Sequence, residues 1–288
     1  MKLKTYKNIA IATALIGLCQ GAHAAVSNTG LVGYYSFDSD TADDTSATLG
    51  GSASSNSGAW TGSSNYGAGL FGNAATVSDG AGSNFLTVSG SEYNFGTNSF
   101  TVILWARLAS SATTTQSDPP LVASGGRNWS SSGTAPAGYN LDYTSGDNIG
   151  ATLSGGSGAT RTDVAHIDID YTDWSMIALS VDRDTDIATV YALDELVTTI
   201  GDDSSAPTSN SLAAGASLTL NNDIVFGQDG DGAGYTSLPA TGIDDVSIRN
   251  GNKSLFSRSN TCTSKPYFFN SSCNTSKVYK IANFKSNF

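Results

Sequence analysis

The sequence predicts an all-β protein, a two-sheet antiparallel sandwich of the jelly-roll type, and three observations support this. Short apolar runs alternate with clusters of Gly, Ser, Asp and Asn, which is typical of short strands joined by turns. The strong helix formers Ala, Leu, Glu and Lys form no long runs. One run, at 99–108, is apolar on both faces when it is read as a strand.

The apolar runs give the expected strands in order along the chain. They lie at 31–37, 84–88, 99–108, 120–124, 139–144, 174–182, 187–200, 218–227 and 242–250. The run at 99–108 places Ile103 and Trp105 on its second apolar face, so we expect a central strand that is covered on both sides. The segment "VDRDTDI" at 181–187 predicts a hairpin with a polar tip.

The first 24 residues have the three parts of a secretory signal peptide. A lysine-containing start is followed by an apolar run and by a small-residue cleavage site that ends at Ala24. The apolar run is shorter than the ~20 residues that span a bilayer, and no later run reaches that length. We therefore expect a soluble secreted protein, extracellular or periplasmic, with no membrane insertion.

Charge divides the chain into two parts. Residues 25–245 hold four arginines, no lysine and all 25 acidic residues, a net charge of −21, whereas residues 246–288 hold basic residues and no acid. Nucleic acids and anionic membranes bind through Lys and Arg contacts to phosphate, so the acidic body excludes both as partners. Nearly all of the acids are Asp, the acid of turns and calcium loops.

The same division predicts one β domain over 25–252 and a basic, poorly ordered tail over 253–288. Lys, Ser and Asn dominate the tail, and a chain of that composition cannot bury a core. Two interpretations of the tail stay open: a native mobile segment, or a segment read out of its ancestral frame after a frameshift.

Five stretches, in this order, resemble the laminin G-like branch of the concanavalin A-like lectin/glucanase superfamily. They are "GLVGYYSFD", the segment from "FGNAA" to "NFLTV", "SFTVILWAR", the segment from "DWSMIALSVDRD" to "VY", and the segment from "FGQDGDGAGY" to "GIDDVSIRN". The resemblance covers nearly all of the body and implies the sandwich fold. It does not imply one function, because the superfamily contains lectins, adhesion modules, glycosidases and lyases.

The resemblance also implies a structural Ca²⁺ that links the start and the end of the sandwich. The matching positions are Asp38 at the start and Asp244 or Asp245 at the end. Asp244 alternates with Val246 and Ile248, so we expect its carboxylate to point toward the interior, where a cation would offset the burial of its charge. The alternative is that Asp244 accepts backbone N–H groups or pairs with an arginine.

The segment "HIDIDYTDW" at 166–174 holds the one histidine of the body among three aspartates, which makes it a candidate metal or catalytic cluster. Strand alternation places His166, Asp168 and Asp170 on one face, about 6.5–7 Å apart per step. Ligands of one zinc lie about 2 Å from the metal, so a straight strand cannot supply three of them. We interpret this face as solvated.

A catalytic site is not predicted. Glu92 and Glu195 lie far apart in the sequence, outside any paired-carboxylate motif of the glycosidases. No nucleophile-elbow motif accompanies the single body histidine. The sequence therefore predicts a non-enzyme.

Ligand contacts are instead expected on loops at one rim, where aromatic and polar side chains can bind a glycan. The candidates are Arg127, Asn128, Trp129, Asp229, Asp231 and Tyr235. For each aromatic, packing beneath its loop is the competing interpretation, and for the aspartates a plain acidic turn. The predicted function is recognition of an extracellular glycan or a cell-surface or matrix protein. A polysaccharide-degrading enzyme, or the targeting remnant of a truncated secreted hydrolase, is the alternative.

Overall fold

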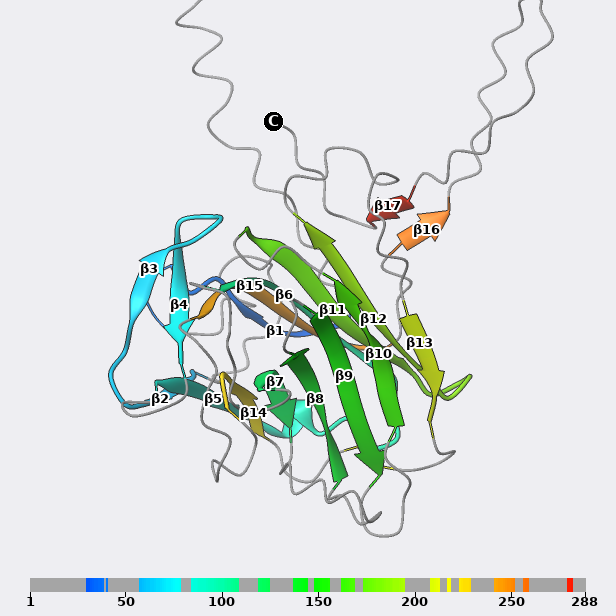
Figure 1. Cartoon of the computed structure of the whole chain (residues 1–288). Coiled ribbons are helices and arrows are strands. Elements are labelled where there is room, and N and C mark those ends of the chain that lie inside the picture. Colours follow the sequence, from blue (N-terminus) through cyan, green and yellow to red (C-terminus); the bar gives the residue numbers. More distant parts are fainter. Residues whose placement is uncertain are drawn as a thin grey trace, which may run out of the picture.

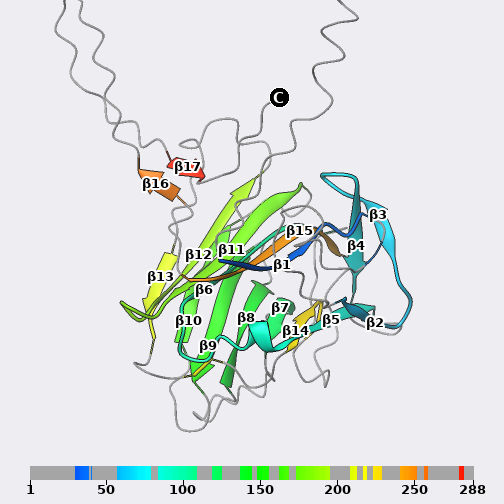
Figure 2. The ribbon, with the colours of Figure 1, turned by 180° about the vertical axis from the view of Figure 1, so that it is seen from behind.

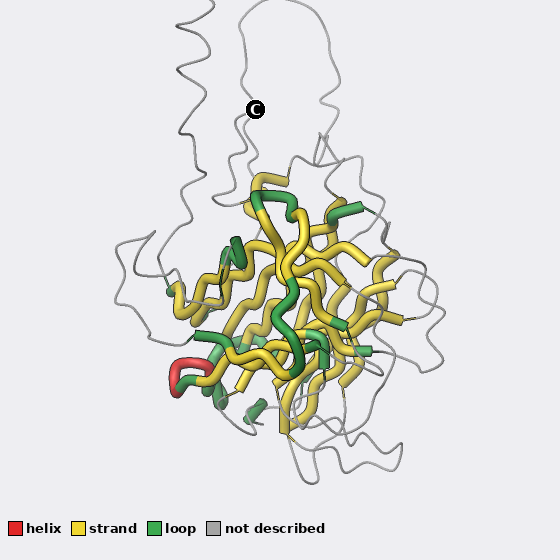
Figure 3. The backbone as a smooth tube through the Cα atoms, turned by 90° about the vertical axis from the view of Figure 1, so that its left-hand side faces the viewer, coloured by secondary structure: helices red, strands yellow, loops and turns green. Residues whose placement is uncertain are grey.

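A computed structural model gives the arrangement of the body (Figure 1). It describes residues 30–38, 40, 57–78, 84–108, 119–124, 137–144, 148–155, 162–168, 173–194, 208–212, 217–218, 223–228, 241–251, 256–258 and 279–281. Within these ranges the chain forms strands and one 3-10 turn, Ser91–Tyr93, and the strands make up the layers in Figure 3.

One sheet has eight strands, and all of its pairs are antiparallel. Its path runs β13 (Thr208–Ser211), β12 (Ile187–Asp194), β11 (Ser175–Asp182), β6 (Phe100–Leu108), β15 (Thr241–Asn250), β4 (Asn73–Val77) and β3 (Tyr66–Ala68). The first strand, β1 (Leu31–Tyr35), pairs with β15, so the start of the sandwich lies beside its end.

The second sheet has seven strands and is also antiparallel. Its path runs β10 (Thr162–Asp168), β9 (Asn148–Gly155), β8 (Ala137–Thr144), β7 (Pro120–Ser124), β14 (Asp223–Phe226), β5 (Phe85–Ser89) and β2 (Ala59–Thr61). The predicted all-β sandwich of two antiparallel sheets is confirmed.

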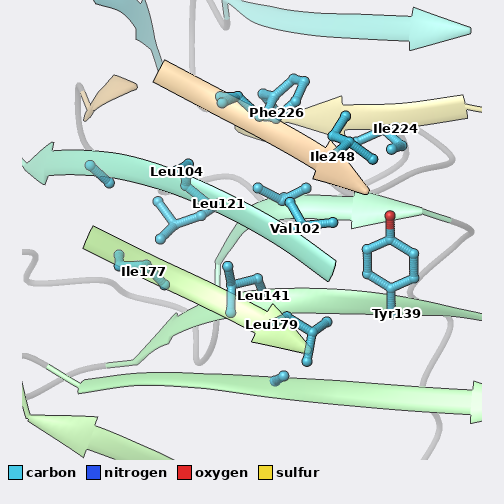
Figure 4. Packing of buried hydrophobic residues seen from close by; sticks show 14 of the residues in the cluster. Val102, Leu104, Leu121, Tyr139, Leu141, Ile177, Leu179, Ile224, Phe226 and Ile248 are labelled. Atoms are coloured by element: carbon cyan, nitrogen blue, oxygen red, sulfur yellow. The ribbon is translucent and has the colours of Figure 1, made fainter. Parts of the chain in front are cut away.

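The core lies between the sheets, and β6 contributes one face to it (Figure 4). Val102 and Leu104 of β6 point inward with Ile177 of β11, and all three are buried. On the outer face of the same strand, Ile103 packs in a second, smaller apolar cluster. The prediction of a central strand with two apolar faces is therefore correct, since β6 lies between β11 and β15.

Figure 2 shows the two sheets from behind. Side chains contact across both edges of the sandwich. At the β2–β3 edge, Trp60 and Tyr66 pack edge to face with ring centroids 5.8 Å apart. At the β10–β13 edge, the hydroxyl of Thr162 donates to the carbonyl oxygen of Ser211 at 3.3 Å. Trp60 is partly buried and also packs against the core.

The predicted hairpin at 181–187 forms between β11 and β12. Asp182 Oδ1 accepts the backbone N–H groups of Asp184 and Thr185 at 2.9 and 3.4 Å, which is a local aspartate turn. Asp186 adopts a positive φ of 51° and pairs with Arg183 at 3.3 Å. The acidic tip is thus a turn stabilised by its own side chains.

Two short strands of the tail, β16 (Phe256–Arg258) and β17 (Tyr279–Ile281), pair with each other and with neither sheet. The other tail residues and the predicted signal peptide lie outside the described residues. Among the residues that the structure describes, no helix has the length and apolar character needed to cross a membrane.

Candidate functional site

A tight turn at residues 69–72 joins β3 to β4 and lies over the outer face of the eight-stranded sheet. The hairpin closes with Ala68 opposite Asn73, and the backbone N–H of Gly69 donates to the carbonyl oxygen of Gly72 at 2.9 Å. Gly69 and Gly72 are required because aspartate side chains approach both of them closely. A Cβ on Gly69 would lie 2.6 Å from Asp244 Oδ2, and a Cβ on Gly72, whose φ is +90°, would overlap Asp38 Oδ1.

Asp244 holds the tip of this turn from below. Its Oδ2 accepts the backbone N–H groups of Leu70 and Phe71 at 2.8 and 3.0 Å. Its Oδ1 is buried and has no hydrogen-bond partner among the described residues. The side chain is fully buried, and this burial raises the pKa of the Asp244 carboxyl from its usual 3.8 to about 7.

The predicted orientation of Asp244 is wrong. Asp244 lies opposite Trp105 of β6 on the outer face, whereas Val246 and Ile248 point into the core. The reason is a β-bulge between Asp244 and Ser247, where Asp245 has a positive φ of 46°. One extra residue reverses the alternation, so neighbours two positions apart no longer share a face. Asp244 is buried because the turn covers it.

Asp38 holds the other end of the same turn. It follows β1, and its Oδ1 accepts the backbone N–H of Asn73 at 3.0 Å. The Asn73 side-chain amide in turn donates to the backbone carbonyl of Asp38. The two residues that the sequence selected from opposite ends of the domain, Asp38 and Asp244, therefore both contact residues 69–73.

Asp245 is oriented differently from the other two predicted metal residues. Its Oδ1 accepts a hydrogen bond from the hydroxyl of Tyr34, on the neighbouring strand β1. Within the described residues, no group of three or more His, Cys, Asp or Glu side chains is arranged to hold a metal ion. A cation at the turn would therefore need backbone oxygens as well as carboxylates.

An aromatic pair extends from the turn across the outer face of the eight-stranded sheet. Phe71 is 50% exposed, and its ring packs edge to face against Trp105 with centroids 6.1 Å apart. Trp105 and Tyr191 pack against the buried cluster of Ile103, Met176 and Ala178. The sequence assigned Trp105 to packing and did not select Phe71 at all. The apolar tip of a glycine turn is the signal that could have found it.

Trp174 is buried on this outer face, with 4% exposure. The guanidinium of Arg107 lies 5.0 Å from the centre of its ring, within the range of a cation–π contact. One of the few cations of the body therefore interacts with an indole.

The outer face of the seven-stranded sheet carries small polar side chains that the sequence analysis did not single out. Asn140 and Asp142 of β8 alternate with core residues, and Thr152 of β9 lies opposite Asn140. The Thr152 hydroxyl donates to Asp142 Oδ2 at 2.8 Å. All three side chains are buried, so they form a covered polar layer and not an exposed binding surface.

The predicted rim residues Arg127, Asn128, Trp129, Asp229, Asp231 and Tyr235 lie outside the described residues. The strands that precede these two groups are described. β7 ends at Ser124, and its antiparallel neighbour β14 ends at Phe226, which lies opposite Val122. The chain therefore leaves toward the two groups from opposite ends of the β7–β14 pair.

Of the residues considered for catalysis, Glu92 is the one whose side chain the structure describes. Glu92 lies in the 3-10 turn, and its buried Oε1 has no hydrogen-bond partner among them. The side chain of His166 and the whole of Glu195 lie outside the described part.

No family model matches this sequence, and no curated protein matches it. Solved structures do match. One belongs to work on botulinum neurotoxin type C, whose cell entry depends on interaction with two ganglioside molecules: TM-score 0.55, 12% identity, covering 78% of this chain and 49% of that one. Another is the binding domain of botulinum neurotoxin DC in complex with rat synaptotagmin II: TM-score 0.55, 14% identity and the same coverages.

A third match is domain 4 of AbnA, an extracellular arabinanase from Geobacillus stearothermophilus, in complex with arabinotriose. Its TM-score is 0.51 at 18% identity, and the match covers 78% of this chain and 95% of that domain. This chain spans about half the length of the two toxin chains. At these identities the likeness establishes the β-sandwich fold and nothing finer.

Proposed function

We propose that this chain is a secreted, non-catalytic recognition module that binds an extracellular glycan or a cell-surface or matrix protein. The observation that carries the proposal is the match to a single sugar-binding domain over nearly its whole length. The toxin matches add sandwiches that bind gangliosides or a protein receptor. The signal-peptide pattern supports secretion.

A glycan array that is run with the purified full chain tests this proposal. Binding to one glycan class, lost in Trp129→Ala without a change in melting temperature, supports recognition through the predicted rim loops. Release of reducing ends from any polysaccharide in a parallel degradation assay would instead support the enzyme alternative. A chain that binds no glycan and no cell surface would leave only the remnant interpretation.

We also propose that Ca²⁺ binds at the turn of residues 69–73 and stabilises the sandwich. Asp244 supplies a buried carboxylate oxygen without a hydrogen bond, and Asp38 supplies a second carboxylate on the same turn. Two oxygens approach the same point beside Gly69. A Cβ on Gly69 would lie 2.6 Å from Asp244 Oδ2 and 2.7 Å from the carbonyl oxygen of Asn73. Ca²⁺ accepts mixed sets of carboxylate, carbonyl and water oxygens.

Melting curves with and without a chelator test the calcium proposal. Chelation is expected to lower the melting temperature of the wild type, because a ligand that binds only the folded state stabilises it by mass action. Asp244→Asn is the matched variant, because it keeps an acceptor for Leu70 and Phe71 but removes the charge. Identical wild-type melts with chelator and with excess calcium would eliminate the metal.

A further inference from the structure

We propose that Phe71 and Trp105 form a carbohydrate-stacking subsite on the outer face of the eight-stranded sheet, and that it takes the ring of a neutral sugar. The juxtaposition that carries this is a half-exposed phenyl ring against a half-buried indole, with centroids 6.1 Å apart. Neither residue is among the predicted rim residues, so the subsite goes beyond the recognition site proposed above.

The indole has a rigid floor. Beneath Trp105 lie Ile103, Met176 and Ala178, which are 5%, 1% and 0% exposed. Trp105 lies on β6, which is hydrogen-bonded to strands on both sides. A ring supported in this way loses little freedom when a ligand packs against it, and this preorganisation favours binding.

The phenyl ring is held from the turn side. The two N–H groups that Asp244 accepts belong to Leu70 and to Phe71 itself, and Asp38 accepts the N–H of Asn73 just beyond. These bonds fix the backbone that carries Phe71, and the contact with Trp105 orients its ring. A large aromatic ring that is fixed in a half-exposed position presents a flat apolar surface to solvent.

The surroundings select a neutral sugar. The Asp38 carboxylate contacts the turn and the Asp245 carboxylate lies on β15 beside Tyr34, and negative charge at these positions repels uronate, sulfate or sialate. The nearby cation, Arg107, already lies over the ring of Trp174.

A protein partner fits this surface poorly. A stable protein interface needs about 800 Å² on each partner and several buried anchors. Among the described residues, the exposed large hydrophobic side chains are Phe71 and, at the far end of the sheet, Ile187. One exposed ring beside one half-buried ring matches the face of a sugar unit.

The test uses the indole N–H signals of the ¹⁵N-labelled full chain. The chain has four tryptophans, so each signal can be assigned by a Trp→Phe variant. The probes are xylohexaose, cellohexaose, mannohexaose and arabinohexaose at about 10 mM, enough to fill a site of millimolar Kd, with oligogalacturonate as the acidic arm. We expect at least one neutral probe, and not the acidic one, to shift the Trp105 signal.

A shift of Trp129 alone overturns this subsite while supporting the rim loops. A Trp105 shift with oligogalacturonate alone overturns the neutral assignment, and no shift of Trp105 with any probe overturns the subsite. With the probe that binds, Phe71→Ala should weaken the affinity about tenfold, and Phe71→Trp should retain it. Ile187→Ala, an exposed apolar residue at the opposite end of the same sheet, is the control and should bind as the wild type does.

Discussion

At the residue scale, the burial of Asp244 is the feature with the largest energetic consequence. Two backbone N–H groups stabilise one of its oxygens, but the other oxygen has lost water without gaining a hydrogen bond among the described residues. Removing a charged group from water is unfavourable unless its partners replace the water fully. Burial therefore favours the protonated carboxyl, and its raised pKa is the direct expression of this.

The first prediction concerns the pH dependence of stability in the metal-free protein. The folded pKa of Asp244 is about 7, above the usual 3.8 that applies when the chain is unfolded. Well below pH 3.8 the carboxyl is protonated in both states, and its contribution to the free energy of unfolding is fully present. As pH rises toward 7 the unfolded chain ionises first, so the free energy of unfolding falls, by at most about 4 kcal/mol.

Denaturant melts in the presence of a chelator, at intervals from pH 4 to pH 8, measure this loss. The other acids titrate in the same range, so the quantity to follow is the difference between the wild type and Asp244→Asn. We expect the wild type to lose stability relative to the variant as pH rises, with the change complete above pH 7. A difference that is constant with pH contradicts the assignment.

The second prediction separates two effects of a side chain at a glycine. Gly72 and Gly251 have positive φ values of 90° and 91°, so Ala at either position pays a similar backbone penalty of about 1 kcal/mol. Only at Gly72 would the new Cβ overlap the Asp38 carboxylate, whereas at Gly251 nothing lies within 4 Å. We expect Gly72→Ala to be the more destabilising by about 1–3 kcal/mol.

Urea melts of the two variants measure the difference, and a double variant identifies its cause. In an Asp38→Gly background, Gly72→Ala should cost only about as much as Gly251→Ala does, because the overlapping carboxylate is then gone. Equal losses in Gly72→Ala and Gly251→Ala would show that the turn does not lie against Asp38.

Residue-level reasoning from the sequence selected Asp38 and Asp244, and its alternative role for Asp244, acceptance of backbone N–H groups, is the contact that the structure shows. The family-like motifs placed them at the two ends of the domain, and β1 does pair with β15. Alternation failed at Asp245, because a left-handed residue inside a strand leaves no signal in an apolar pattern. Phe71 was missed because a single apolar residue between glycines has no periodicity.

At the scale of elements, strands that carry an apolar run were predicted, including the short β5, β7 and β14, and strands without such a run were not. β6 and β11 carry continuous apolar sequence and lie in the middle of their sheet. β2 and β3 have three residues each, and β9 has Gly, Thr and Ser at alternate positions, so all three are recognisable only through their partners. Tertiary pairing, not local propensity, makes them strands.

The third prediction tests the central place of β6. Leu104 is fully buried between the sheets, so Leu104→Ala should lower the free energy of unfolding by about 2–5 kcal/mol, through lost burial and the cavity left behind. Ile187→Ala, where the side chain is 37% exposed at the end of β12, should cost much less. Urea denaturation of both variants measures the contrast, and similar losses would contradict the packing described.

At the scale of the whole molecule, the acidic body and the basic tail are joined at the end of β15. Every pair in the two sheets is made by residues up to Asn250, while β16 and β17 pair only with each other. The body therefore has all of its described strand pairs without the tail. It also carries a charge of −21 between residues 25 and 245, which opposes compaction at low ionic strength.

The fourth prediction follows from this separation. A chain that ends at Gly251 should fold and melt cooperatively, because it keeps both sheets. Without the basic residues beyond 251, its self-repulsion is larger, so its melting temperature in low salt should lie below that of the full chain. Raising salt to about 0.5 M shortens the Debye length to a few ångströms and should bring the two melting temperatures together. Calorimetry across a salt series measures the melting temperatures of the truncated and the full chain. A truncated chain that fails to melt cooperatively even in high salt would mean that the tail contributes packing and not only charge.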